Sequence, residues 1–379
     1  MQSVKLGSII HLEKGKKAIK LSSVAQNGWL PYVDIHTFET KAVANFTDGE
    51  KCLPCKNGEI LIVCDGSRSG LVGKAIDGYV GSTLAKISAE GVIPEYLFYY
   101  LQEKYPKLNT QKKGTGTPHL NQALLKDEII NIPSVDEQFH TVAYIDEIFL
   151  ELDKVVDTLK KVKEQLAVYR QAVLVDAFRV ATNSTHLKIG YVCAKIVDCP
   201  HSTPKWEKNG KLCLRTTNFK RGYLDLQSPN YVSEETFNDR NRRIIPQPGD
   251  VLYSREGSVL GIACTIPSNV YPCLGQRMML LRSGEKLNNR YLMHYLNSPM
   301  VTNHVIATKG GTGSPHINVG DIKEFKIPIP SLEEQSNIVR QIEEQLSSCD
   351  NVEKTVDAIL AQTDAMRQSI LKQAFEGTL

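Results

Sequence analysis

The sequence has little that would place its 379 residues in a membrane or in an oxidising compartment. It contains no uncharged apolar stretch of about 18 residues, so no transmembrane helix is expected. Its first residues lack the long apolar core of a secretory signal. The nine cysteines are odd in number and scattered, which is typical of free thiols in a reducing cytosol. We therefore expect a cytoplasmic protein, long enough for two or three domains.

Motifs that carry chemistry are also missing. Gly73-Lys74 is followed by Ala75 and has no glycine five residues before it, so it does not fit a phosphate-binding loop. There is no strand-linked GxGxxG, no HExxH and no Asn/Asp-Pro-Pro-aromatic segment of an amino-methyltransferase. Cys52 and Cys55 form a lone CxxC with no second pair, which favours chance placement over a zinc site. We expect no catalytic residue and no metal in this chain.

The charge is uneven along the chain although the net charge is only +3. Residues 1–133 carry +3, residues 134–180 carry −3, residues 181–330 carry +8 and residues 331–379 carry −5. Basic segments therefore alternate with acidic ones. This pattern suggests that the basic segments meet a polyanion while the acidic segments do something else.

An internal repeat organises the whole sequence. The stretch GTGTPHLN (Gly114–Asn121) returns as GTGSPHIN (Gly311–Asn318), 197 residues later. The same offset holds without a gap to the Ala-Phe pairs at 177–178 and 374–375. Upstream the match is weaker and gapped, for example between GEIL at 58–61 and GDVL at 249–252. Each copy thus has a diverged part followed by a closely matched tail, as expected for two similar roles with different specificities or for relaxed constraint on the diverged parts.

Each tail has the pattern of a long helix. After Pro133 and Pro330 the tails open with the capping boxes Ser134–Glu137 and Ser331–Glu334. Apolar residues then recur at steps of three and four, which predicts a coiled-coil seam. The first series is Val142, Ile145, Phe149, Leu152, Val155, Leu159, Val162, Leu166, Tyr169 and Val173. The second series is Val339, Ile342, Leu346, Cys349, Val352, Val356, Ile359, Thr363, Met366 and Ile370.

Two arrangements of these helices are open. They are either a spacer in which two antiparallel helices of roughly 65–70 Å hold the diverged parts apart, or a helical hairpin inside a larger core. The acidic, polar outer faces favour the spacer. The diverged parts contain short β-type runs at Glu59–Cys64, Val80–Ile87, Gly249–Ser254 and Met278–Arg282, and helical patterns at Pro94–Lys104 and Asn289–Asn297.

The predicted fold is therefore α+β. Two tandem domains with a curved mixed β-sheet and short helices, at residues 1–133 and 181–330, are separated by two long antiparallel coiled-coil helices at 134–180 and 331–379. The two copies are expected to be related by a pseudo-two-fold.

Nearly the whole chain resembles the specificity subunit of type I restriction-modification enzymes. The resemblance rests on NGEILIVCDGSRSG and PGDVLYSREGSVLG, the helices PEYLFYYL and NRYLMHYL, the two GTG loops, and the tails from IPSVDEQ and IPSLEEQ to AVLVDAF and SILKQAF. It implies that each globular part is a target recognition domain for one half of a bipartite DNA site. It also implies that the helices bind modification subunits, expected to be two, and that restriction subunits join them. S-adenosylmethionine, ATP and Mg²⁺ are expected only in those partners.

The GTG loops are the first candidates for DNA contact. Their small residues allow close backbone approach, and their cationic and amide side chains suit phosphate or bases. The candidates are Lys112, Lys113, Thr115, Thr117, His119, Asn121, Lys309, Thr312, Ser314, His316 and Asn318. Because the Pro-His-x-Asn motif is the same in both copies, a phosphate-binding or bracing role is favoured over base reading.

Positions that differ between the copies are better candidates for sequence reading, since arginine commonly reads guanine and asparagine reads adenine. In the first domain they are Asp65, Ser67, Arg68 and Ser69, supported by Lys14, Lys16 and Lys17. In the second domain they are Arg215, Asn218, Lys220, Arg221, Arg240, Arg242, Arg243, Arg255 and Arg277. The leading hypothesis is a DNA-reading subunit without catalysis of its own, and the alternative is a coiled-coil scaffold whose β domains bind proteins.

Overall fold

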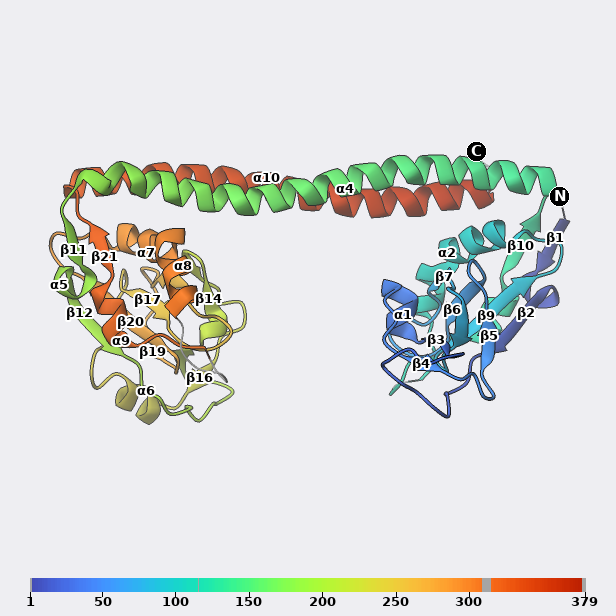
Figure 1. Cartoon of the computed structure of the whole chain (residues 1–379), viewed down its shortest axis with the longest axis horizontal. Helices are drawn as coiled ribbons and strands as arrows, with labels where there is room; N and C mark the ends of the chain where they lie inside the picture. The colour runs from blue at the N-terminus through green and yellow to red at the C-terminus, as the bar shows by residue number, and fades with distance from the viewer. Residues whose placement is uncertain (1, 115, 309–314, 377–379) are drawn as a thin grey trace. The chain divides into compact units, whose positions relative to one another are not determined.

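The structure is a computed structural model that describes residues 2–114, 116–308 and 315–376. It divides into two compact units (Figure 1). The first unit consists of Met1–Leu159 with Ala358–Leu379, and the second of Lys160–Asp357. Each unit therefore contains one globular domain, part of the first long helix and part of the second.

Among its described residues, the first unit has three small sheets. An antiparallel sheet has the strand order β2-β9-β6-β7, a mixed sheet has the order β4-β3-β8-β5, and β1 pairs with β10. The strands are β1 (Gln2–Lys5), β2 (Ile10–Lys14), β3 (Leu30–Val33), β4 (Phe46–Thr47), β5 (Leu53–Cys55), β6 (Ile60–Val63), β7 (Val72–Lys74), β8 (Gly78–Val80), β9 (Leu84–Ala89) and β10 (Ile129–Ile132). The helices are α1 (Ile35–Thr40), α2 (Pro94–Thr110) and α3 (Gln122–Asp127).

The second unit has the same plan. Its antiparallel sheet has the order β12-β20-β17-β18, its mixed sheet has the order β16-β13-β19, and two further pairs are β11-β21 and β14-β15. The strands are β11 (His186–Lys188), β12 (Cys193–Asp198), β13 (Lys211–Leu214), β14 (Phe219–Lys220), β15 (Tyr223–Leu224), β16 (Tyr231–Val232), β17 (Val251–Ser254), β18 (Ala263–Thr265), β19 (Cys273–Leu274), β20 (Met278–Ser283) and β21 (Lys326–Pro328). The helices are α5 (Ile189–Val192), α6 (Glu234–Arg240), α7 (Asn289–Asn297), α8 (Pro299–Thr308) and α9 (Val319–Glu324).

The two units match strand for strand in their central sheets. β6 (Ile-Leu-Ile-Val) and β17 (Val-Leu-Tyr-Ser) are both fully buried, as expected for strands covered on both faces. In each mixed sheet a strand pair is parallel, β3 with β8 and β13 with β19. The predicted α+β fold with two tandem domains is confirmed, with the expected mixed sheet divided into an antiparallel and a mixed part.

The predicted strand at Val80–Ile87 is wrong as a single element. β8 ends at Val80 and β9 begins at Leu84, in a different sheet, because the chain turns at Gly81. The Gly81 N–H donates to Val33 O at 2.9 Å, and a Cβ at Gly81 would lie only 2.8 Å from that oxygen. The helix predicted at Pro94–Lys104 continues to Thr110, whereas α7 has its predicted bounds.

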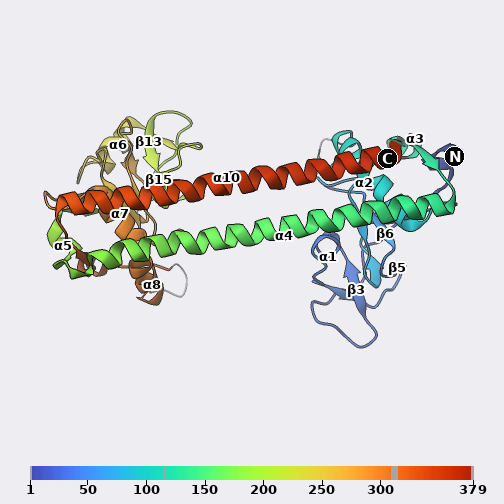
Figure 2. The ribbon, with the colours of Figure 1, turned by 90° about the horizontal axis from the view of Figure 1, so that it is seen from above.

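The long helices are α4 (Val135–Val180) and α10 (Leu332–Glu376), seen in green and red in Figure 2. Both predicted capping boxes form: Ser134 N–H donates to Glu137 Oε2 at 2.9 Å, and Ser331 N–H donates to Glu334 Oε2 at 2.9 Å. None of the helices among the described residues is long and apolar enough to cross a membrane.

Ion pairs show that the long helices run antiparallel in the second unit, because Lys163 pairs with Asp357 whereas Arg170, seven residues later, pairs with Asp350, seven residues earlier. In the second unit Arg170 bonds Asp350 and Glu353, both at 2.7 Å. In the first unit Arg367 bonds Asp153 at 2.6 Å. The 197-residue offset carries Arg170 onto Arg367 and Asp153 onto Asp350, so the repeat places the same ion pair once in each unit.

The predicted seam is one residue out of register at five positions. Val155, Tyr169, Val352, Ile359 and Met366 are 38–50% exposed, so the prediction that they lie in the seam is wrong. The neighbouring positions that are less exposed instead are Val156, Arg170, Glu353, Leu360 and Arg367. An α-helix has 3.6 residues per turn and drifts from a strict 3.5-residue repeat. Arg170 and Arg367 also point toward the other long helix, because each bonds a carboxylate of that helix. The predicted Phe149, Leu152, Leu159, Leu166, Leu346, Val356 and Ile370 are partly or fully buried.

The carboxyl end of each long helix packs on the globular domain of the other copy. Phe375 of α10 contacts Tyr96 and Tyr100 of α2 at ring-centroid distances of 5.0 and 5.5 Å. Phe178 of α4 packs in the same edge-on way on Tyr291 and Tyr295 of α7. This reciprocal exchange is what a symmetric dimer of two repeats would make.

A buried glutamine fixes the amino end of each long helix. Gln138 accepts a hydrogen bond from Ile93 N–H at 2.9 Å and donates to the carbonyls of Gly91 and Pro133. Gln335 makes the equivalent three bonds, to Asn288 N–H and to the carbonyls of Lys286 and Pro330. Neither glutamine is exposed to solvent. Each long helix is therefore joined to a domain at both ends.

Candidate nucleic-acid interface

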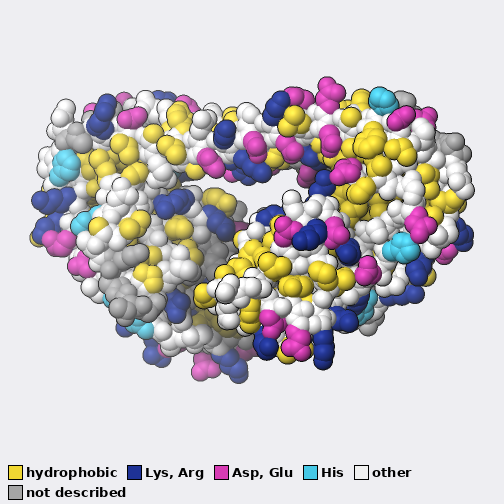
Figure 3. All heavy atoms as spheres, turned by 45° about the vertical axis from the view of Figure 1, so that its right-hand side comes forward, with side chains coloured by type: hydrophobic (Ala, Val, Ile, Leu, Met, Phe, Trp, Pro, Cys, Tyr) yellow, Lys and Arg dark blue, Asp and Glu magenta, His cyan; other side chains and the backbone are white. Residues whose placement is uncertain are grey.

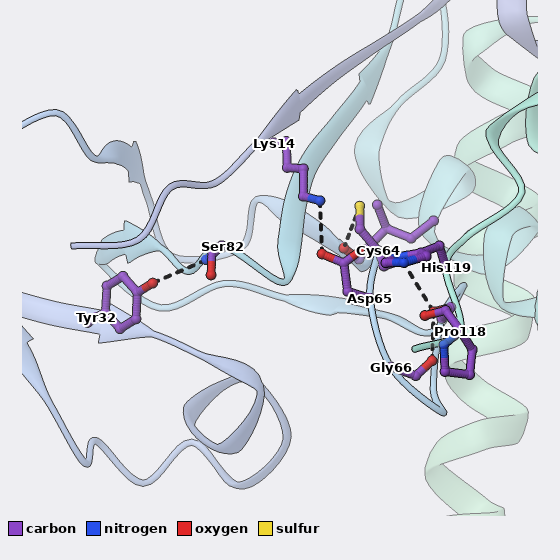
Figure 4. A network of polar contacts seen from close by, with 10 residues as sticks. Lys14, Tyr32, Cys64, Asp65, Gly66, Ser82, Pro118 and His119 are labelled. Carbon is purple, nitrogen blue, oxygen red and sulfur yellow. Dashed lines mark hydrogen bonds and ion pairs between the residues drawn. The ribbon is translucent and has the colours of Figure 1, made fainter. Parts of the chain in front are cut away.

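In the first domain, the loop at residues 112–121 is braced against the turn that follows β6. Gly66 N–H donates to Pro118 O and Leu120 N–H donates to Cys64 O, both at 2.8 Å. His119 Nδ1 lies 2.7 Å from Asp65 Oδ1, and Lys14 Nζ donates to Asp65 Oδ2 at 2.8 Å (Figure 4). Three segments distant in sequence therefore meet at one carboxylate.

The electrostatics of this carboxylate follow from its two partners. Partial burial raises the pKa of Asp65, but the hydrogen bonds from Lys14 and His119 outweigh it, so the pKa is lowered overall. The hydrogen bond to Asp65 raises the pKa of Lys14 in turn. Asp65 is thus an anion that positions Lys14 and His119 at the surface of the domain.

The second domain repeats the brace. Gly257 N–H donates to Pro315 O at 2.9 Å, Ile317 N–H donates to Arg255 O at 3.0 Å, and Glu256 forms a backbone bridge with His316. Gly257 has φ of +91°, a conformation that favours glycine. Since the backbone contacts are the same in both copies, the shared Pro-His-x-Asn motif has a bracing role. Asn121 supports this reading, because its side chain caps α3 by accepting from Leu124 N–H.

Most predicted DNA-contacting residues are exposed. They are Lys14, Lys16, Lys17, Ser67, Arg68, Lys113, Thr117, His119, Arg215, Lys220, Arg221, Arg242, Arg243, Arg277 and Asn318. Lys112, Asn121 and His316 are partly buried. Thr115, Lys309, Thr312 and Ser314 lie outside the described residues.

Three predicted DNA-contacting residues are buried, so the prediction was wrong for them. Ser69 is 0% exposed and donates to Gly66 O at 2.7 Å. Asn218 is 5% exposed and accepts from Arg215 N–H at 2.8 Å. Arg255 is 7% exposed and forms a bidentate pair with Asp198, at 2.8 and 2.9 Å. These polar groups are satisfied inside the domain, where they hold the loops in place.

Arg240 was also proposed as a base reader and is likewise buried, at 6% exposure. Its Nη1 donates to the carbonyls of Leu274 and Gly275 at 2.9 and 3.1 Å. Arg240 therefore stabilises the turn between β19 and β20 from the interior of the domain.

The CxxC pair has no metal-site geometry. Cys55 is buried, and its thiol donates to Ile76 O at 3.4 Å. Burial raises the pKa of Cys55 to about 11, which disfavours the thiolate that a metal needs. No group of three or more metal-ligating side chains occurs among residues 2–114, 116–308 and 315–376.

The outer surface of the long helices carries apolar side chains among charged ones, as Figure 3 shows. The exposed large apolar residues there are Val135, Phe139, Tyr144, Leu150, Val155, Val168, Tyr169, Leu332, Val352, Ile359 and Met366. They lie outside the seam, so they are free to contact another protein. Tyr169, Ile359 and Met366, which were predicted to lie in the seam, belong to this surface.

Sequence reasoning missed two features of the site. Gln138 and Gln335 were visible as part of the repeat, but no pattern indicated their anchoring bonds. Trp206 and Gln276 line a cleft of about 300 Å³ in the second domain together with Arg215 and Arg277. These four residues are spread over more than seventy positions, so no local motif brings them together.

Comparisons with known proteins agree with this architecture. The chain is 23% identical to the type I restriction enzyme MjaVIII specificity subunit of Methanocaldococcus jannaschii, covering 99% of this chain and 92% of the relative. It is 22% identical to the EcoDI specificity subunit of Escherichia coli, covering 100% and 88%.

Two solved structures, each 20% identical to the chain, share its fold. One is reported as "Structural basis underlying complex assembly and conformational transition of the type I R-M system", with a TM-score of 0.75 over 100% of this chain and 98% of the other. The second is the HsdS subunit from Thermoanaerobacter tengcongensis, with a TM-score of 0.54 over 100% and 97%.

The family model named type I restriction modification DNA specificity domain matches residues 1–167 and 195–360. One match falls on each copy of the repeat, and together they cover most of the chain. The chain therefore belongs to the family of type I restriction modification DNA specificity domains.

Proposed function

We propose that this chain is the sequence-reading subunit of a type I restriction-modification complex and that it reads a bipartite DNA target, one half-site with each domain. The observation that carries the proposal is the duplicated, braced loop frame with different exposed side chains in the two copies. A shared frame presents each domain to DNA in the same manner, and the differing side chains give each domain its own base preference.

Exposed cations supply the sequence-independent part of the affinity. Both domains carry exposed lysines and arginines, and the segment charge is larger in the second domain, +8 against +3. Lysines and arginines that neutralise phosphates release counterions, so the affinity falls steeply as salt rises.

The long helices bind the partners in this proposal. Their exposed apolar side chains, such as Tyr144 and Leu150 in the first unit and Val168 and Tyr169 in the second, occur in both units. One modification subunit on each unit accounts for this duplication. The partners hold S-adenosylmethionine, ATP and Mg²⁺ and perform methyl transfer and cleavage, whereas this chain contributes register and sequence choice.

An electrophoretic mobility shift of mixed duplex DNA at two salt concentrations, with and without a modification subunit, tests the proposal. Binding that weakens at the higher salt and gains sequence preference with the subunit is expected. Absence of salt-dependent binding in both samples would instead indicate a protein-binding scaffold.

A paired insertion tests the spacer. One heptad is added between Lys161 and Val162 of α4 and one between Ala358 and Ile359 of α10, which are equivalent positions at the 197-residue offset. Each heptad adds ~10 Å, so the gap between half-sites is expected to lengthen by roughly 3 base pairs. An unchanged target sequence would contradict the spacer role.

A further inference from the structure

A cleft lies beside the turn between β19 and β20 in the second domain. Gln276 and Arg277 form this turn, and Trp206 and Arg215 line the cleft beside it. The volume of about 300 Å³ suits the edge of a base rather than a second protein domain. All four residues belong to the second unit.

Side chains in the cleft have hydrogen-bond donors and acceptors that their contacts within the domain do not use. Gln276 exchanges hydrogen bonds with the single hydroxyl of Thr203, at 3.0 and 3.2 Å. A glutamine amide has two donors and an acceptor oxygen with two lone pairs, so one hydroxyl cannot satisfy it. The Arg215 guanidinium lies over the Trp206 ring, 5.4 Å from its centroid, in a cation–π contact that requires no hydrogen bond from its N–H donors to the ring.

Arg277 is presented by a constrained backbone. Its φ is +69°, in the left-handed region that non-glycine residues seldom adopt. The turn is held in place from both sides, because Arg277 O accepts from Arg255 N–H at 3.0 Å and the buried Arg240 donates to Gly275 O at 3.1 Å. Glu256 Oε1 lies 3.8 Å from Arg277 Nε and orients the guanidinium. Strained positions that persist in this way cluster at functional sites.

The corresponding turn in the first domain is anchored by the same two backbone hydrogen bonds and has different side chains, but Thr83 lacks the positive φ of Arg277. Gly275 N–H donates to Leu214 O at 2.9 Å as Gly81 N–H does to Val33 O. Arg255 N–H donates to Arg277 O as Cys64 N–H does to Thr83 O, at 2.8 Å. The turn residues Ser82 and Thr83 therefore occupy the positions of Gln276 and Arg277.

Shared anchoring of the turn with exchanged side chains is what two recognition domains with different targets require. We propose that the Gln276–Arg277 turn is a base-reading site of the second domain, in which Arg277 donates two hydrogen bonds to a guanine in the major groove and Gln276 contacts the adjacent base pair. The Ser82–Thr83 turn reads the other half-site from the equivalent place. This inference rests on the proposed function and names the residues that specify the target.

The test uses the full chain assembled with its modification subunits, on a pool of duplexes randomised over the target. The variants are Arg277→Asn, because asparagine tolerates a left-handed backbone, Gln276→Ala and Thr83→Ala. Lys195→Ala is the matched control, since Lys195 is an exposed cation of β12 that does not line the cleft. Methylated products are sequenced to give a preference at every position.

Arg277→Asn is expected to reduce discrimination for guanine at one position of one half-site by roughly 10- to 100-fold. The other half-site keeps its preferences, and Thr83→Ala shows the reverse pattern. A uniform loss over all sequences in Arg277→Asn identifies a phosphate contact, and unchanged preferences identify a structural turn; either result overturns the inference. If the unaltered complex shows no sequence preference, the proposed function itself fails.

Discussion

The two units share one backbone arrangement and differ in the side chains at their surfaces. Their central sheets have the same strand order, their long helices carry the same arginine–aspartate pair, and their loops are braced through the same backbone bonds. They differ in the side chains at equivalent positions of their turns, for example Ser82–Thr83 in the first unit and Gln276–Arg277 in the second. The difference teaches that the duplicated parts preserve the positions of the turns while the side chains at those turns change.

The packing of the helix ends should break this symmetry most strongly. Phe178 is fully buried, whereas Phe375 is only partly buried. Phe178→Ala is expected to cost about 3–5 kcal/mol of unfolding free energy, and Phe375→Ala clearly less, because its cavity opens to water. Urea unfolding followed by circular dichroism measures both, with the exposed Phe139→Ala as control. Equal losses at the two sites would contradict the asymmetry.

The glutamine anchors should behave alike in both units. Gln138→Leu and Gln335→Leu each leave a buried N–H and two carbonyls without their partner, which is expected to cost about 2–3 kcal/mol in either case. Gln165→Leu, on an exposed face of α4, is the matched control with little effect. A large difference between the two anchors, measured by the same unfolding experiment, would show that the frames are not equivalent.

The inter-helix ion pairs should give a smaller effect. Arg367→Asp alone places two carboxylates together, and adding Asp153→Arg restores an opposite pair. The single change is expected to cost about 1 kcal/mol or less, since Asp153 is exposed, and the double change to recover most of it. Arg170→Asp with Asp350→Arg provides the equivalent cycle in the second unit. A double variant no more stable than the single one would argue against this pairing.

The smallest effect should be the pH dependence of the loop brace in the first domain. Because Lys14 and His119 lower the pKa of Asp65 in the folded state, this carboxylate contributes stability above its unfolded pKa of about 3.9. That contribution is lost as the pH falls through the lower folded pKa. Asp65→Asn should remove this component from an unfolding series between pH 7 and pH 3. A variant that keeps the full acid dependence of the wild type would show that other groups carry it.

The sequence predicted the elements that repeat or obey a strong period. The 197-residue offset, the capping boxes and the apolar spacing predicted both long helices and the tandem α+β domains. The predicted seam register is wrong at Tyr169, because a helical period alone does not show that the neighbouring Arg170 pairs with the other helix. At Val155 the adjacent Val156 is the less exposed residue, and the period does not distinguish two neighbouring valines.

The candidate site was predicted in composition but not in geometry. Basic charge pointed to the second domain, yet Arg240 and Arg255 are buried there on carbonyls and on Asp198. An arginine has the same sequence signature whether it faces DNA or a buried carboxylate, so only the fold separates the two. The turns at Gly81 and Gly275 could not be predicted either, because each glycine contacts a strand that is distant in the sequence.

Sequencing of methylated sites in cells with and without this chain, in the presence of its modification subunits, tests the central claim most directly. We predict one added motif in the cells that contain the chain, made of two short half-sites with a fixed gap of unread bases. A continuous motif, or identical methylation in both cells, would contradict the reading of DNA by two separate domains.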